Sequence, residues 1–230
     1  MTRKGRICLS GILALFAFPA MCLENVASSM DFPGPAPGKA GMKQDGPRIV
    51  LGNKLLSCEW TTDAPELKMP QVRASSASGE LQDSPAAPLQ IVFADGRVLK
   101  STDLKKDGEV AVVRLQPRPD AVRMAERSAG WQTTLPLVSA DGQLRIRWQL
   151  VLRDGSNYVH QALTVTSQAA VSPCELRLGG IRADGAAVVG AVDGSPVVAG
   201  NWFFACEHPM AIHRVEDGEV TASLPRYSPL

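Results

Sequence analysis

The sequence contains little cysteine, few aromatic residues and almost no net charge. Of its 230 residues, 5 are cysteine and 5% are aromatic, and the formal net charge is +1. So little cysteine excludes a fold held by a disulfide framework, and the fold must therefore depend on a hydrophobic core. The balanced charge removes the electrostatic argument for nucleic acid or an anionic membrane as a partner.

The sequence also lacks the motifs of common catalytic sites. It has no Gly-x-Ser-x-Gly, no catalytic-cysteine signature and no phosphate-binding glycine loop. Its aspartates lie mostly in Asp-Gly pairs, where they serve local turns, and no facing carboxylate pair of the kind that glycosidases use is evident. We therefore predict no catalytic residue and no cofactor.

Three potential zinc ligands lie close together near the end of the chain, at Cys206, His208 and His213. Their spacing matches no common zinc signature, and a fourth ligand is not evident. We predict no metal site. A buried cysteine and a histidine at the end of a strand explain the same pattern.

Residues 1–28 have the pattern of a cleaved export signal. Basic residues precede an apolar run over residues 7–18, and Pro19 follows it. The run is shorter than the about 20 residues that a membrane-spanning helix needs. Cleavage is expected after Cys22 or Ser28, which predicts a secreted or periplasmic protein that has no membrane association after cleavage. The basic residues are Arg3, Lys4 and Arg6.

Three cysteines remain once the predicted signal is removed: Cys58, Cys174 and Cys206. An odd number allows at most one disulfide within the chain, and the sequence does not decide which pair would form it. Residues 29–47 are rich in proline and glycine, and such a segment buries too little apolar surface to offset its ordering entropy. We therefore predict a flexible leader over 29–47 and a folded domain over 48–230.

Seven Asp-Gly pairs separate short apolar runs in this domain. Asp-Gly suits the tight turns of β-hairpins, and seven pairs indicate an antiparallel meander. Residues 144–152 alternate apolar and polar, as expected of a strand with one buried face. Only residues 120–127 look helical. The sequence predicts an all-β fold, an antiparallel β-sandwich. The turns are at 95–96, 107–108, 141–142, 154–155, 184–185, 193–194 and 217–218, and the strands are expected at 48–52, 54–60, 89–93, 97–101, 109–115, 144–152, 158–166, 174–181, 186–192, 196–199, 202–206, 211–215 and 219–224.

Residues 200–209 gather three aromatic side chains, an acid and a histidine. In a strand, Trp202 and Phe204 face one side and Phe203 the other, so one aromatic face belongs to the core. The other face either packs in the protein or contacts a ligand, since exposed aromatic patches mark interaction sites. Glu207 and His208 at the strand end are candidates for hydrogen bonds to sugar hydroxyls.

Three segments together resemble a known family. Residues 153–161 (RDGSNYVHQ), residues 194–204 (GSPVVAGNWFF) and residues 207–209 (EHP) resemble the N-terminal β-supersandwich, a galactose mutarotase-like domain, of secreted bacterial α-galactosidase-like glycoside hydrolases of family 36 and its relatives. The resemblance covers residues 48–230. His160 departs from the pattern, because it stands where the family is expected to have an arginine.

The resemblance implies a module that acts on carbohydrate together with a partner domain. In the family, the supersandwich precedes a (β/α)8 barrel that holds two catalytic aspartates, and a sandwich loop can line its sugar site. The resemblance places five residues near that interface as substrate-binding candidates: Asn201, Trp202, Phe203, Glu207 and His208. A barrel needs about 250 residues beyond Leu230, so we expect a domain that is incomplete at its C-terminus and inactive alone. A free-standing carbohydrate-binding protein and a structural interaction module are the alternatives.

Overall fold

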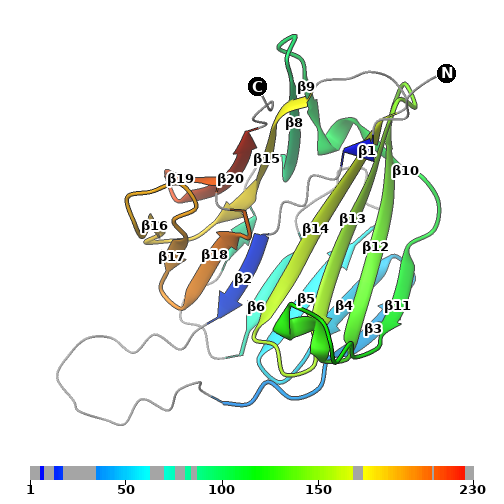
Figure 1. Ribbon diagram of the computed structural model, residues 1–230, viewed down its shortest axis with the longest axis vertical. Helices are drawn as coiled ribbons and strands as arrows, with labels where there is room; N and C mark the ends of the chain where they lie inside the picture. Colours follow the sequence, from blue (N-terminus) through cyan, green and yellow to red (C-terminus); the bar gives the residue numbers. More distant parts are fainter. Residues whose placement is uncertain are drawn as a thin grey trace.

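The computed structural model describes residues 6–7, 13–17, 35–62, 70–75, 81–83, 87–167, 173–208 and 210–225. In this part of the chain nearly all regular structure is β-strand (Figure 1). The helical elements are two short 3-10 helices, η1 (Ser101–Asp103) and η2 (Met124–Arg127). The segment predicted to be helical thus forms only the short η2. No helix in the described ranges has the length and apolar character to cross a membrane.

The strands form three sheets, which we call A, B and C. Sheet A has ten strands, and most of it runs in the order β10-β12-β13-β14-β2-β18-β17-β16, while β1 pairs with β14 and β11 pairs with β12. Its strands are β1 (Arg6–Ile7), β2 (Leu13–Ala17), β10 (Leu104–Lys106), β11 (Ala111–Leu115), β12 (Gly130–Ser139), β13 (Leu144–Arg153), β14 (Tyr158–Ser167), β16 (Ala187–Val188), β17 (Val197–Ala199) and β18 (Trp202–Cys206).

The two other sheets are smaller. Sheet B runs in the order β3-β4-β5-β6, and sheet C runs β19-β20-β15-β8-β9 with β7 paired to β15. Figure 1 shows sheet B behind the lower ends of β12 to β14 and sheet C at the upper left. Their strands are β3 (Gly41–Asp45), β4 (Arg48–Gly52), β5 (Leu56–Thr61), β6 (Gln71–Ala74), β7 (Gln82–Asp83), β8 (Leu89–Phe93), β9 (Val98–Lys100), β15 (Pro173–Arg182), β19 (Ile212–Glu216) and β20 (Glu219–Pro225).

The core of the protein is formed by the inward-facing side chains of all three sheets. Strand β13 shows how the sequence produces it, because its apolar side chains from Leu144 to Leu152 are buried at every second position. At the centre, Trp148 of sheet A meets Trp60 of sheet B edge to face, with ring centroids 5.4 Å apart. Edge-to-face aromatic pairs add about 0.5–1.5 kcal/mol to the burial itself.

The prediction of an all-β fold with antiparallel strands is confirmed, but the division into sheets differs from a two-layer sandwich. Side chains from three separate sheets meet in one core, which resembles the way the blades of a propeller surround a centre. The physical reason is twist. Neighbouring strands are rotated by about 20–25°, so a ten-stranded sheet turns too far to be covered by one facing sheet. Sheets B and C complete the core instead.

Six of the seven predicted Asp-Gly turns are formed, whereas Asp107-Gly108 lies at a bend between β10 and β11. The glycine of all seven pairs has a positive φ, between 68° at Gly185 and 113° at Gly108, a backbone region that glycine enters without steric cost. One of the aspartates also holds distant segments together. Asp154 accepts a hydrogen bond of 2.8 Å from the Ala40 amide and one of 3.1 Å from Arg114 Nη2.

Ordered structure begins before the predicted domain start at Arg48. Residues 41–45 of the predicted leader form strand β3, which pairs with β4, and Ala40 is buried in the core. Anchoring of the Ala40 amide by Asp154 explains why this segment is ordered despite its glycines. Among the described residues, Cys58 and Cys174 are free thiols.

Candidate functional site

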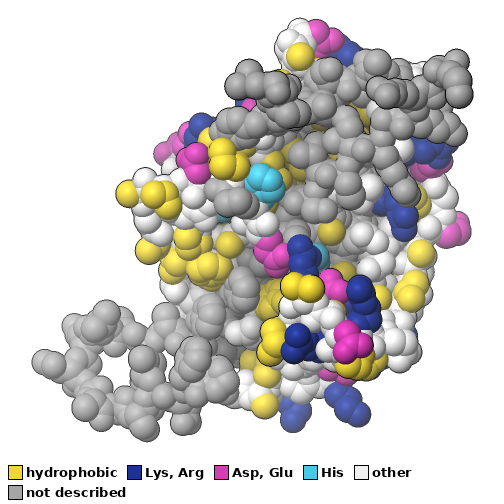
Figure 2. Space-filling view, in the orientation of Figure 1, with side chains coloured by type: hydrophobic (Ala, Val, Ile, Leu, Met, Phe, Trp, Pro, Cys, Tyr) yellow, Lys and Arg dark blue, Asp and Glu magenta, His cyan; other side chains and the backbone are white. Residues whose placement is uncertain are grey.

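A cleft of about 400 Å³ lies on the outer face of sheet A, under the loop that carries η2. Its floor comes from β12, β13 and β14, its roof from residues 123–126, and one side from Glu207 just after β18. Figure 2 shows basic and acidic side chains gathered with a histidine on this face. The volume falls within the range of about 300–1,000 Å³ typical of small-molecule sites.

The floor of the cleft is formed by side chains that alternate with core side chains along the strands. Because the inward positions of β13 and β14 fill the core, the intervening side chains point outward. The strand register places His160 beside Val151, and Val151 beside Gln132. Gln132 and Gln149 each place their amide nitrogen 3.3 Å from Thr134 Oγ1, which leaves their amide oxygens as acceptors for a ligand.

The roof is held in place by arginine contacts. Arg118 Nη1 lies 2.8 Å from the Glu126 carboxylate, and Arg127 Nε donates to the Ala121 carbonyl at 2.9 Å. From the floor, Arg153 Nη1 donates to the carbonyl oxygen of Ser128 at 2.7 Å. These contacts fix an irregular loop over the sheet, so the cleft is formed before any ligand arrives.

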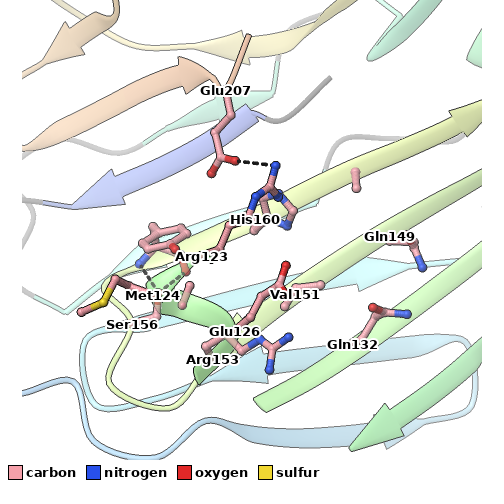
Figure 3. Close-up of a pocket in the computed structure, with 13 residues that line it drawn as sticks. Arg123, Met124, Glu126, Gln132, Gln149, Val151, Arg153, Ser156, His160 and Glu207 are labelled. Carbon is pink, nitrogen blue, oxygen red and sulfur yellow. Dashed lines mark hydrogen bonds and ion pairs between the residues drawn. The ribbon is translucent and has the colours of Figure 1, made fainter. Parts of the chain in front are cut away.

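His160 is the central polar group of the floor. Its Nε2 is buried and has no hydrogen-bond partner among the described residues. Figure 3 shows the ion pair of Arg123 and Glu207, 3.6 Å apart, beside the imidazole ring. Burial lowers the pKa of His160, against the effect of Glu207, so the ring is neutral at pH 7. A neutral imidazole offers either a donor or an acceptor at Nε2.

The other ionisable groups of the cleft are balanced in charge. Burial raises the pKa of Tyr158, and the Glu207 carboxylate adds to the effect, so the phenol stays protonated. Burial lowers the pKa of Arg153, which nevertheless remains a cation at neutral pH. With Arg123 and Arg153 opposite Glu126 and Glu207, the charges in the lining cancel.

The five substrate-binding candidates from the sequence lie in different surroundings. Trp202 and Asn201 are buried, at 3% and 6% exposure, and Trp202 belongs to the core. Phe203 points to the opposite face of β18 and is half-buried, whereas His208 is exposed and accepts a hydrogen bond of 3.2 Å from the Met210 amide. Among the five, Glu207 lines the cleft. The structure therefore does not bring the predicted set together: Trp202 and Asn201 are buried, whereas Glu207 lines the cleft.

The sequence analysis missed the floor and the roof of the cleft. The outward positions of β13 and β14 carry only a weak signal. Gln149, Arg153, Tyr158 and His160 can form hydrogen bonds, but Arg145 and Thr164 on the same faces can do so as well, as on any exposed strand face. The sequence carries no signal for the roof, because the position of the roof depends on contacts between residues far apart in the sequence.

Cys206 and His213, considered above as zinc ligands, have other contacts. The Cys206 amide donates to His213 Nε2 at 3.0 Å, and His213 Nδ1 lies 2.7 Å from the Ser195 carbonyl oxygen. Because Nε2 accepts, the proton lies on Nδ1 and both ring nitrogens are used. In the part of the chain that the structure describes, no group of three or more His, Cys, Asp or Glu residues is arranged to hold a metal ion.

Comparison with known proteins gives no relative. No family model matches the chain, and neither a curated protein nor a solved structure matches it.

Proposed function

We propose that the protein binds a neutral carbohydrate in this cleft and acts as a non-catalytic module. The observation that carries the proposal is that His160 Nε2, at the floor of a polar cleft, is buried and has no hydrogen-bond partner in the part of the chain that the structure describes. A buried polar atom without a partner costs about 1–3 kcal/mol. A ligand hydroxyl at this position would remove that cost.

The chemistry of the lining suits a sugar. Hydroxyl groups both donate and accept hydrogen bonds, and the cleft offers acceptors at Glu207 and the two glutamines and donors at Arg123 and Tyr158. The half-buried ring of Tyr158 adds an apolar surface for sugar C–H groups. The cancelled charge argues against phosphate or another strong anion as the ligand.

The family resemblance supports a more specific role as the front module of a secreted α-galactosidase-like hydrolase. Glu207, which belongs to the resembling segment 207–209, is also the residue that closes one side of the cleft. On this proposal, residues 1–28 direct export and a partner barrel supplies the catalytic aspartates. N-terminal sequencing of the exported protein tests the first part, and an N-terminus at Met1 or Thr2 would refute it.

The binding proposal is tested by calorimetric titration of the purified protein with galactose and short α-galactosides. His160→Phe and Glu207→Gln are expected to weaken binding by about 10–100-fold, the effect of one hydrogen bond to a buried or charged group. Glu216→Gln, on an exposed position of β19, is the matched control and should bind normally. Equal affinity in all variants, or none in the wild type, would contradict the proposal.

The same protein should not hydrolyse a nitrophenyl α-galactoside above a buffer blank. Glu126 and Glu207 are the carboxylates that line the cleft. Turnover that disappears in Glu126→Gln or Glu207→Gln would show that the cleft is catalytic, and would overturn the non-catalytic assignment.

A further inference from the structure

Strand β2 fills a gap one strand wide in the middle of sheet A (Figure 1). Three of its residues pair with β14 at Tyr158, Val159 and His160, and all five pair with β18 between Trp202 and Cys206. It is antiparallel to both neighbours, so β14 and β18 run parallel to each other. We call the space between these two strands the slot.

The slot has a definite chemistry. The eight residues that pair with β2 include no lysine, arginine, aspartate or glutamate. On the core side it is bounded by Val159, Trp202 and Phe204, all buried. An occupant must therefore be an extended segment of at least five residues whose core-facing side chains are uncharged, since a charged side chain would be desolvated against this apolar surface.

The present occupant lies within the predicted export signal. Leu13–Ala17 is part of the apolar run of residues 7–18, which leaves the protein if the signal is cleaved after Cys22 or Ser28. Removal would open the pairing edges of β14 and β18 together. Open apolar edges attract other strands, and proteins normally cover them.

We propose that in the exported protein the slot binds an extended strand from a partner polypeptide, which runs antiparallel to β14 and β18 and whose core-facing side chains are uncharged. Recognition combines backbone hydrogen bonds on both sides with apolar contacts on the core side, as in strand addition to a sheet edge. The proposal rests on export with cleavage and is independent of carbohydrate binding. The slot adjoins the cleft, because His160 belongs to both.

The test uses exported protein whose N-terminus has been determined by mass spectrometry, and a synthetic peptide with the sequence of residues 11–20. A peptide concentration about a hundred times its Kd should raise the Tm by about 5–10 °C. Hydrogen exchange should slow at residues 158–160 and 202–206. A peptide with Leu15→Pro is the control and should do neither, because proline removes a ladder hydrogen bond.

Three results would overturn the proposal. Retention of residues 13–17 in the exported protein would assign the strand to the fold itself. A processed protein with a cooperative melt and no response to the peptide would show that the slot has closed. If light scattering shows a dimer that the peptide does not dissociate, the pairing edges of β14 and β18 are covered by a second copy of the protein. Failure of the sugar titration alone would leave the strand proposal intact.

Discussion

At the scale of single residues, His213 connects three segments of the chain. Through its two nitrogens it joins the amide of Cys206 at the end of β18 to the carbonyl of Ser195 before β17. Both contacts require the neutral ring with its proton on Nδ1. Burial lowers the pKa of His213, although the hydrogen bond to Ser195 opposes the change.

This arrangement predicts a loss of stability in mild acid. The unfolded chain takes up a proton near pH 6.5, whereas the folded ring does so only at lower pH, so the unfolded state binds more protons as pH falls. The Tm of the wild type should therefore decrease between pH 7 and pH 5. His213→Gln should have a lower Tm at pH 7 and a smaller decrease. The pKa of His160 is also lowered, so the variant His160→Gln measures how much of the decrease in Tm is due to His160. Parallel pH profiles for the wild type and His213→Gln would refute this role.

The aromatic strand β18 tests the division between core and surface. Trp202 and Phe204 are 3% and 0% exposed, whereas Phe203 on the other face is half-buried. Trp202→Ala should lower the free energy of unfolding by about 3–5 kcal/mol, measured by urea denaturation. Phe203→Ala is the neighbouring control and should cost clearly less. The sequence predicted that one face of this strand is core, but only the packed structure shows which face it is.

At the scale of elements, the ten-residue strand β12 was absent from the predicted strands. Gln132, Thr133 and Thr134 break the apolar alternation, and Pro136 argues against a strand between two others. The structure accommodates the proline where pairing with β10 stops. The Asp107 amide donates to the Pro136 carbonyl at 2.9 Å, so the nitrogen of Pro136 also faces that edge. A proline there ends the ladder without breaking the pairing to β13.

The position of this proline leads to a prediction about β12. Pro136→Ala should change the free energy of unfolding by less than about 1 kcal/mol, because the Pro136 nitrogen donates no hydrogen bond and an alanine keeps the carbonyl that accepts from Asp107. Val138→Pro should cost about 3 kcal/mol or more, since Val138 pairs with Lys105 of β10. Both positions are half-buried, which makes the two variants a matched pair. An equal loss of free energy of unfolding in Pro136→Ala and Val138→Pro, measured by chemical denaturation, would contradict the register between β12 and β10.

At the scale of the whole molecule, the sequence predicted the strands and turns better than their assembly. Strands at 48–52, 89–93 and 202–206 have the predicted bounds, because Asp-Gly turns and alternation are local signals. The three-sheet arrangement depends on twist summed over many strands, and the cleft depends on a loop folded over distant strands. Neither leaves a local pattern. Of the predicted site residues, Glu207 alone lines the cleft.

Burial in the core also determines how reactive the cysteine thiols are. Cys58 and Cys206 are buried and Cys174 is exposed. Burial raises the pKa of Cys58 to about 12, and a protonated thiol reacts slowly. A thiol reagent should therefore modify Cys174 but not Cys58 in the native protein, and both after denaturation without reductant. Protection of Cys58 or Cys174 from the reagent in the denatured protein would reveal a disulfide and contradict the structure.

The parallel orientation of β14 and β18 has a consequence for the order of assembly. Two parallel strands one strand apart form no hydrogen bonds with each other, so the two halves of sheet A are joined only when a third strand lies between them. If that strand comes from another polypeptide, the last step of folding is a second-order reaction. Its rate would then depend on the concentration of the donor, and until the donor arrives the protein would persist as a folding intermediate with an open sheet.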